Sequence, residues 1–469
     1  MDPWRVISRS LTTSPDRRYS EEDYELLASD LPPRLNNTAR SRRSRLQACL
    51  HHLTLRRVLV FVALIPFLLA IGVLWSGIPP SYKGIRAFER HLPQHNVTEA
   101  LTEHRLYLRF PDHIWGHGLN NVLQEALLLH HIAYEANRSF VFEDHVWSHL
   151  PFPYTLYDFA LRPVRIPLNA FISGPTAGGP MPHSTAISAE FWESVCPPER
   201  RRIVSSKDTP KDAQGDVILD WWVSRLKNVL DQCVEIHSRD YPIFDVPDRV
   251  VSLWPALSTS SILTDYLWSP LVQAAVLRNF PVFQPASAKA LYNFSPDATL
   301  PGLVAVHLRR GDYMRHCPRL AGWQAHYNGI NELPELPDKF DPSPFEFDTD
   351  AYNDYYMEHC LPTVEQLVKR LRALRKEHLG LRRVYVLTNA WGWFIDSLKT
   401  ALLEDGWDDL RSSFDLELDS AQKYVAMAVD MAIAEKSEVF LGNGFSSLSS
   451  NIVMLRMAKG LGASSNRFL

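Results

Sequence analysis

The feature that constrains this chain most is an uncharged, strongly apolar stretch at Val58–Ile78, VLVFVALIPFLLAIGVLWSGI. About 20 such residues in a helix cross the hydrocarbon core of a bilayer. Trp75 lies where an interfacial aromatic residue is expected, and Pro66 is tolerated in such a helix. A cleaved signal peptide is the alternative, but its apolar core lies close to residue 1. The stretch therefore predicts a transmembrane helix at 58–78.

The charges beside this stretch predict its orientation. Arginines crowd its N-terminal side at Arg40, Arg42, Arg43, Arg45, Arg56 and Arg57, whereas only Lys83, Arg86 and Arg90 closely follow it. Positive residues stay on the cytosolic side of a membrane. We therefore expect a single-pass type II protein of the Golgi or ER membrane. It would have a disordered cytosolic tail at 1–57, a stem at 79–104 and a lumenal remainder.

The lumenal remainder has the composition of a folded protein. Of the 469 residues, 46% are hydrophobic and 22% charged, and the formal net charge of −4 gives no sign of nucleic-acid binding. The length beyond the stem exceeds what one core usually holds. Two domains are expected, at 105–299 and 300–469.

Covalent features agree with a lumenal location. An even number of cysteines lies there, which favours two disulfides in an oxidising compartment. Three pairings stay open, and nearest-neighbour pairing is our hypothesis: Cys196–Cys233 and Cys317–Cys360. Asn96 is the best N-glycosylation candidate, while Asn137 and Asn293 are poorer sequons and Asn36 faces the cytosol.

Strand-like and helical segments alternate along the predicted second domain. The expected strands are Leu303–Leu308, Arg383–Thr388, Ser413–Leu418 and Glu438–Gly442. The expected helices are Tyr352–Glu377, Trp393–Leu403, Ala421–Lys436 and Asn451–Lys459. The predicted first domain begins with a loop, a helix and a strand: Trp115–Asn121, 119–133 and Ser139–Asp144. This alternation predicts an α/β fold with doubly wound parallel sheets.

The sharpest local signal is VAVHLRRGDY at Val304–Tyr313. An apolar strand ends there in His307, Arg309, Arg310 and Asp312. Guanidinium groups at the tip of a buried strand need anionic partners, and phosphate oxygens suit their fork of donors. The structural alternative is a salt bridge with Asp312, and the motif alone leaves the two readings open.

Two glycine-containing loops favour the interpretation that the arginines bind phosphate. GNGFSSLSSN at Gly442–Asn451 follows a strand and precedes a helix, so its hydroxyl and N–H groups can cradle an anion. An ordinary serine N-cap is the alternative. WGHGLNN at Trp115–Asn121 has the same position before a helix, and Gly116 and Gly118 permit close backbone approach. Together the three loops predict a diphosphate ligand.

These motifs resemble those of the GDP-fucose-dependent fucosyltransferases, the protein O-fucosyltransferase and α1,6-fucosyltransferase superfamily. The resemblance lies in GLNN before a helix, HLRRGD, and FLGNGFSSLSSNIVMLR, over about 105–165 and 300–460. LPELPDKF and NRSFVF make the chain similar to fungal O-fucosyltransferase-like membrane proteins. The resemblance implies a GT-B fold, in which two Rossmann-like domains face a cleft and the second holds GDP-fucose.

The resemblance also implies roles for individual residues. Arg309 would contact the β-phosphate, with Arg310 beside it. The other donor-binding residues would be His307 and Asp430 at the guanine, Ser446 and Ser447 at the pyrophosphate, Asp312 beside the arginines, and Gly118 and Asn121 across the cleft. Fucose would pass with inversion to a protein Ser/Thr or a glycan, without a metal or other cofactor. Asp348 and Asp350 form a DxD pattern, for which helix capping is favoured over metal binding.

One feature departs from the superfamily pattern. Relatives with a clear catalytic base place a glutamate in the N-terminal glycine loop or shortly after the double arginine, and neither region has one here. His117 is a candidate base, or the acceptor needs little base assistance. Two alternatives to fucosyl transfer therefore stay open: another GDP-sugar donor, and a catalytically inactive, membrane-anchored nucleotide or glycan binder.

Overall fold

The computed structural model describes residues 80–111, 118–149, 152–157, 160–210, 212–237, 247–284, 299–345 and 347–469, and in the apolar stretch 59–60, 62, 64–68 and 71–72. The chain divides into two compact units, Met1–Ser76 and Gly77–Leu469. The predicted cytosolic tail at 1–57 and much of the predicted transmembrane helix at 58–78 lie outside the described residues. Among the residues that are described, no helix combines the length and the apolar character needed to cross a membrane.

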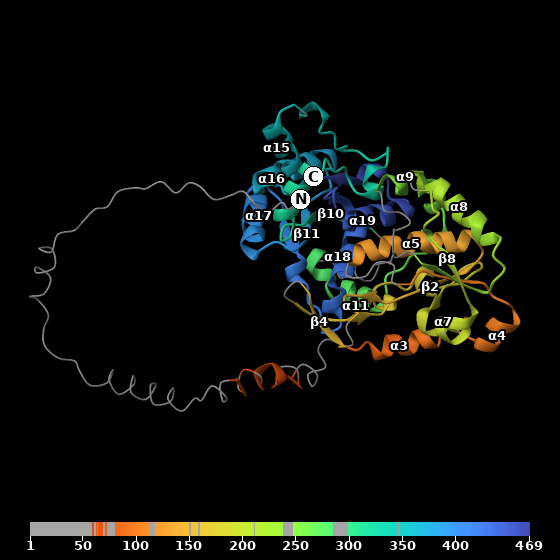
Figure 1. The fold of residues 1–469 in the computed structure, drawn as a ribbon. Helices are drawn as coiled ribbons and strands as arrows, with labels where there is room; N and C mark the ends of the chain where they lie inside the picture. Colours follow the sequence, from red (N-terminus) through yellow and green to blue (C-terminus); the bar gives the residue numbers. More distant parts are fainter. Residues whose placement is uncertain are drawn as a thin grey trace, which may run out of the picture. The chain divides into compact units, whose positions relative to one another are not determined.

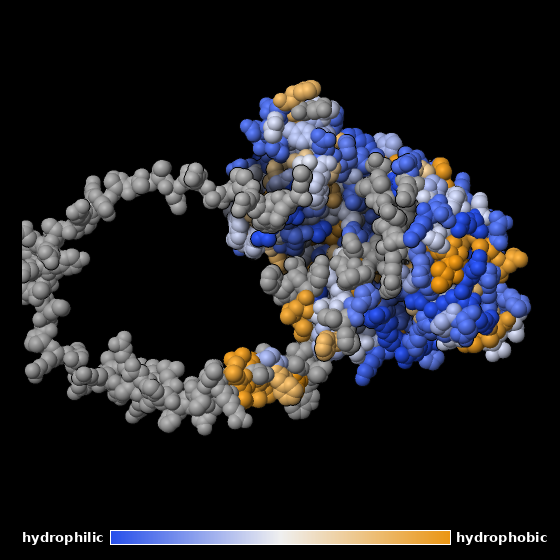
Figure 2. Space-filling view, in the orientation of Figure 1, coloured by the Kyte–Doolittle hydropathy of each residue, from blue (hydrophilic) through white to orange (hydrophobic). Residues whose placement is uncertain are grey.

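The described residues of the apolar stretch are helical, and their large side chains are exposed. These form an apolar surface in Figure 2 and comprise Leu59, Val60, Val62, Leu64, Ile65, Phe67, Leu68 and Ile71. Contiguous apolar surface is unfavourable in water at roughly 25 cal/mol per Å². These exposed side chains belong to the described part of the predicted transmembrane helix.

Gly77–Leu469 is built on two five-stranded sheets whose strand pairs are all parallel (Figure 1). The first sheet has the order β7-β2-β1-β9-β8. Its strands are β1 Tyr107–Arg109, β2 Ser139–Phe142, β7 Ile187–Ser188, β8 Arg201–Ser205 and β9 Cys233–His237.

Helices cover both faces of the first sheet. The helix α7 (Ala189–Val195) packs on one face, where Trp192 is fully buried, and the Cys196–Cys233 disulfide joins its C-terminal end to β9. The helices α5 (Leu119–Glu135) and α8 (Gly215–Lys227) cover the other face. Both faces of β2 are buried, as in parallel sheets generally.

The second sheet has the order β12-β11-β10-β13-β14, with β10 in the middle. Its strands are β10 Leu300–Leu308, β11 Arg383–Thr388, β12 Asp409–Ser412, β13 Ser437–Gly442 and β14 Asn466–Phe468. Alternate side chains of β10 point to opposite faces. Val304 and Val306 pack with α16 (Val364–Glu377) and α17 (Gly392–Glu404), whereas Ala305 packs on the side of α18 (Ala426–Glu435) and α19 (Ser447–Ala458).

Further helices join and surround the sheets. They are α3 Lys83–Arg90, α4 Val97–Thr102, α6 Leu168–Phe171, α9 Pro247–Leu257, α10 Ser261–Thr264, α11 Pro270–Arg278, α12 Phe280–Phe283, α14 Tyr313–Gly322 and α15 Thr349–Cys360. The short strands are β3 His145–Val146, β4 Tyr154–Tyr157, β5 Ala160–Pro163 and β6 Arg165–Ile166. The 3-10 helices are η2 Pro175–Ala177, η3 Pro198–Arg200, η4 Gly329–Glu332, η5 Ser343–Phe345, η6 Ser413–Asp415, η7 Gln422–Val425 and η8 Ala463–Ser465. Within Gly77–Leu469, the half that carries the first sheet meets the half that carries the second sheet where α5 packs on α19 and α11 packs on α18 (Figure 1).

Two predicted elements are wrong. The helix expected at Tyr352–Glu377 is two helices, α15 and α16, because Pro362 has no N–H group and Thr363 starts the second helix with a capping box to Gln366. The strand expected at Ser413–Leu418 is absent: β12 ends at Ser412, whose side chain and N–H group bond Asp415 to form η6.

Part of the predicted stem belongs to the folded unit. The stem was expected at 79–104, but its residues form α3 and α4. The Tyr82 hydroxyl donates to the Ala421 carbonyl oxygen at 3.0 Å, and Arg86 makes two 2.6 Å hydrogen bonds to Asp144. Whether 105–299 and 300–469 are separate domains stays a prediction.

Candidate functional site

The candidate site lies at the carboxyl end of β10, where ligands bind in open parallel sheets. His307, near the end of the strand, is buried, and its Nδ1 lies 2.9 Å from the Ser449 Oγ of α19. Burial, and to a smaller extent the nearby Arg309, lower the pKa of His307 to about 3. The imidazole is therefore neutral near pH 7 and fixed against α19.

Arg309 forms an ion pair with the carboxylate three residues later in the chain. It donates from Nε at 3.1 Å and from Nη2 at 2.7 Å to the two carboxylate oxygens of Asp312, and its guanidinium lies 4.7 Å from the Tyr313 ring centre. The side chains of Arg309 and Asp312 are 39% and 49% exposed. An exposed pair of this kind contributes about 0–1 kcal/mol. An incoming anion can therefore compete for Arg309 at small cost.

Arg310 has a different environment. Its Nη1 donates to the Pro362 carbonyl oxygen at 2.6 Å, and its guanidinium lies 3.8 Å from the Phe394 ring centre. Its buried Nε has no hydrogen-bond partner among the described residues. Burial lowers the pKa of Arg310. Much of this side chain is thus used in packing against α17.

Asn389, which no sequence motif singled out, shapes the turn that holds both arginines. It follows β11, and its Oδ1 accepts hydrogen bonds from the Arg310 N–H at 2.8 Å and the Gly311 N–H at 3.2 Å. Its Nδ2 donates to Asp312 at 3.0 Å. Partial burial raises the pKa of Asp312, but bonds from Arg309 and Asn389 lower it more, so the net shift is downward.

The serine-rich loop begins α19 beside this turn. Ser446 is the N-cap, its Oγ accepting from the Leu448 N–H at 3.3 Å, and Ser447 is the first helical residue. Gly444 leaves no space for a side chain because a Cβ there would overlap the Tyr327 ring. Asn443 bonds the Cys360 carbonyl oxygen at 2.8 Å. Ser446 is thus an ordinary serine N-cap, one of the two interpretations of this loop. The N-terminus of α19 is also a favourable place for an anion.

Asp430, which the resemblance assigns to the guanine, lies on the same side of the second sheet as His307. It accepts hydrogen bonds from the Tyr385 hydroxyl at 2.5 Å and the Ser413 hydroxyl at 2.9 Å. Burial raises the pKa of Asp430 to about 7. Tyr385 lies on β11 and Ser413 directly follows β12, so the Asp430 carboxyl group is held against this face of the second sheet.

The N-terminal loop meets the second half at α19. Gly118 is the N-cap of α5, and the exposed Asn121 lies in the first turn. Asn451 of α19 donates to the backbone oxygen of Asn120 at 2.8 Å and to its side chain at 3.2 Å. Both helix N-termini lie at the carboxyl ends of their sheets, so these ends come together here. His117 lies outside the described residues.

The second disulfide and the DxD pattern lie in the neighbouring segment. Cys317 is bonded to Cys360, so both bridges of the structure follow the nearest-neighbour hypothesis. Asp348 caps α15, accepting from the Asp350 and Ala351 N–H groups. Within the described part of the chain, no group of three or more His, Cys, Asp or Glu residues is arranged to hold a metal.

The arrangement brings together a half-exposed guanidinium, a helix N-terminus with serine hydroxyls and a buried neutral histidine. These groups are suited to binding a phosphate-containing ligand at the carboxyl end of the second sheet. The structure brings Arg309, Asp312, His307 and Ser446 to this end through β10 and α19. It turns Arg310 toward α17.

Comparisons with known proteins found a matching family model and several similar solved structures. Residues 288–459 match the family described as GDP-fucose protein O-fucosyltransferase. Similar solved structures include POFUT1 in complex with GDP, at 12% identity and a TM-score of 0.47, covering 78% of this chain and 98% of that one. POFUT1 in complex with GDP-fucose has 14% identity, a TM-score of 0.46 and coverages of 77% and 97%. A FUT1 mutant from Arabidopsis thaliana in complex with GDP has 10% identity and a TM-score of 0.37, covering 81% of this chain and 78% of that one. No curated protein matches significantly.

Proposed function

We propose, from the premise that residues 288–459 are a domain of the GDP-fucose protein O-fucosyltransferase family, that the protein is a glycosyltransferase using GDP-fucose. It transfers fucose with inversion to a hydroxyl group of a glycoprotein or glycan. The observation that carries the proposal is the half-exposed Arg309 beside the N-terminus of α19, within the matched segment.

The chemistry assigns Arg309 the main catalytic role. As the bond from fucose C1 to the phosphate oxygen breaks, negative charge grows on the β-phosphate of GDP. A guanidinium fixed there stabilises the transition state more than the ground state. Arg309 can leave Asp312 for the phosphate because their ion pair is exposed.

The surrounding residues bind and position the donor in this proposal. Ser446, Ser447 and the N-terminus of α19 hold the pyrophosphate, while His307 and Asp430 lie toward the guanine. Asn121 reaches from α5, whose first turn touches α19 through Asn120 and Asn451. Arg310 supports the turn from beside Phe394.

The protein acts from a membrane in this proposal, as a single-pass type II protein of the Golgi or ER. The support is the uncharged stretch at Val58–Ile78, the arginines before it, and the exposed apolar side chains of its described residues. The sequon at Asn96 would then be glycosylated.

The test offers the detergent-solubilised full chain a panel of nucleotide sugars, with and without EDTA, and measures sugar release. We expect turnover of GDP-fucose that EDTA does not abolish and that Arg309→Ala loses. Turnover of a different GDP-sugar would change the donor. Tight GDP binding without turnover or transfer would identify an inactive binder, and metal-dependent use of a UDP-sugar would overturn the proposal.

A further inference from the structure

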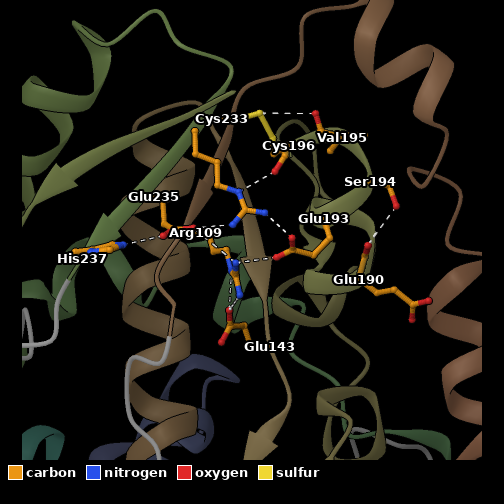
Figure 3. A network of polar contacts seen from close by, with 11 residues as sticks. Arg109, Glu143, Glu190, Glu193, Ser194, Val195, Cys196, Cys233, Glu235 and His237 are labelled. Atoms are coloured by element: carbon orange, nitrogen blue, oxygen red, sulfur yellow. Dashed lines mark hydrogen bonds and ion pairs between the residues drawn. A yellow bond between two sulfur atoms is a disulfide. The ribbon is translucent and has the colours of Figure 1, made fainter. Parts of the chain in front are cut away.

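A network of charged side chains lies on the face of the first sheet that α7 covers, outside the site described above (Figure 3). Arg109, the last residue of β1, donates to Glu143 at 2.8 Å and to Glu193 of α7 at 3.0 Å. Glu193 also pairs with Arg201 of β8. At the carboxyl tip of β9 this network ends in Glu235 and His237.

Glu235 and His237 form a dyad. Two residues apart on a strand, they point to the same face, the one covered by α7. The His237 Nε2 lies 2.8 Å from the Glu235 Oε1 (Figure 3). The Glu235 side chain is 9% exposed and that of His237 46%. A buried carboxylate that orients an accessible imidazole is the arrangement by which enzymes position a general base.

The groups around the dyad fix its geometry. The Glu235 Oε2 lies 3.6 Å from Nη1 of both Arg109 and Arg201, so guanidinium groups from β1 and β8 hold the carboxylate from both sides. Glu143 and Glu193 in turn hold Arg109. The His237 Nδ1 makes no hydrogen bond to any described residue. This nitrogen is therefore available to accept a proton.

The position of the dyad fits an acceptor site. The strands β1 and β9 are neighbours. The next described helix after each of them contacts the part of the protein that carries the second sheet. After β1, α5 touches α19 through Asn120 and Asn451; after β9, the next described helix, α9, packs on η4. There the Ile330 N–H group of η4 donates to the Ser450 Oγ of α19 at 3.0 Å. The described helices that follow β1 and β9 thus both contact the part of the protein that carries the second sheet.

We propose that His237, oriented by Glu235, is the general base that deprotonates the acceptor hydroxyl, an inference that rests on the proposed function. The acceptor oxygen bonds to fucose C1 while the bond from C1 to the phosphate oxygen breaks, and its electron pair leaves with GDP. The hydroxyl proton passes to the His237 Nδ1. Glu235 stabilises the resulting imidazolium through Nε2, and the proton then returns to solvent.

The test uses GDP-fucose hydrolysis by the full chain, with water as the acceptor, across a pH series. Wild-type turnover should fall toward acid pH as the base is protonated. His237→Gln should lower the rate about 100-fold or more, the contribution typical of a general base, and remove that acid limb. Imidazole added to His237→Ala should restore part of the rate. Glu235→Gln should lower kcat with little change in KM.

The control is His183→Gln, an exposed histidine stacked on Tyr134 in the same half of the protein. It should keep the wild-type rate and pH profile. Thermal melting establishes that each variant is folded. A wild-type rate in His237→Gln, or a lost rate that imidazole does not restore with the acid limb unchanged, would overturn the assignment. Absence of turnover in the wild-type protein would instead remove the proposed function, and the inference with it.

Discussion

At the scale of single residues, two adjacent arginines have different surroundings. Arg309 is held by an exposed carboxylate, whereas Arg310 is held by a backbone oxygen and the ring of Phe394. Adjacent residues at the end of a strand diverge because their side chains leave opposite faces. Arg309 is therefore free to change partner, and Arg310 contributes more to the packing of α17.

Replacing Arg309 should abolish most turnover without unfolding the protein. We expect Arg309→Ala to lower kcat for GDP-fucose about 100- to 1,000-fold, as for loss of one donor to a developing oxyanion. Arg309→Lys should recover little, because an ammonium group cannot replace the guanidinium fork. The measurement is steady-state GDP release. Arg315→Ala, an exposed arginine on α14, is the matched control; equal effects of both changes would contradict the role of Arg309.

Asp430 should make stability depend on pH. Burial raises its pKa to about 7 in the folded protein, so between about pH 4 and 7 the folded state holds a proton that the unfolded state has lost. Stability from this group is thus greatest in acid and falls as pH rises through 7. We expect the unfolding free energy of Asp430→Asn, from urea titrations at several pH values, to fall less over this range. Parallel wild-type and variant curves would contradict this.

At the scale of elements, the strongest sequence patterns predicted the structure well. The segment RVYVLT is β11 from Arg383 to Thr388, and the helix after GLNN begins at Leu119. The break at Pro362 was missed because apolar residues keep helical spacing across it. The segment SFDLEL alternates like a strand, but Asp415 bonds Ser412 and ends the extended chain.

The candidate site could be proposed from the sequence only where its residues are contiguous. HLRRGD and the serine-rich loop are single segments, so Arg309, Asp312 and Ser446 could be named in advance. Asn389 could not, because its role depends on the register that sets Thr388 opposite Leu308. The contact of Asn120 with Asn451 likewise depends on how two helices pack, which no local pattern encodes.

A side chain at Gly444, in the loop before α19, should destabilise the protein. Its Cβ would overlap the Tyr327 ring, which is buried among Phe340, Phe445 and Phe468 and bonded to the Leu469 oxygen, so the ring cannot move aside. We expect Gly444→Ala to lower the melting temperature by several degrees, for a destabilisation of about 1–3 kcal/mol. Stabilisation by added GDP should also weaken.

The comparison for this change is Gly322→Ala at the end of α14, where a Cβ meets open space. That change should leave stability unchanged or raise it slightly, because alanine favours helix. A melting temperature of Gly444→Ala equal to that of the wild-type protein would show that the loop can move away from Tyr327.

At the scale of the whole molecule, the groups proposed to act on the donor and on the acceptor come from two different parallel sheets. Arg309 comes from the second sheet, and Glu235 and His237 from the first. The contacts that set their relative position are those of α5 with α19 and α11 with α18. The proposed catalysis therefore depends on these helix contacts holding the two sheets in a fixed relative position.

The proposed type II orientation is tested by glycosylation on the two sides of the apolar stretch. Asn96 is exposed at the start of α4, and its Oδ1 caps the helix through the Glu99 N–H group at 3.2 Å. A glycan on Nδ2 leaves this oxygen in place, so we expect modification without loss of stability. In eukaryotic cells the full chain should stay in carbonate-washed membranes, and Asn96→Gln should remove a glycan detected by a glycosidase gel shift. Asn36→Gln, in the sequon before the stretch, should change nothing. The positive-inside rule keeps the arginines and the Asn36 sequon in the cytosol, where they are not glycosylated. A glycan on Asn36 would therefore show that the topology is the opposite of the proposed one.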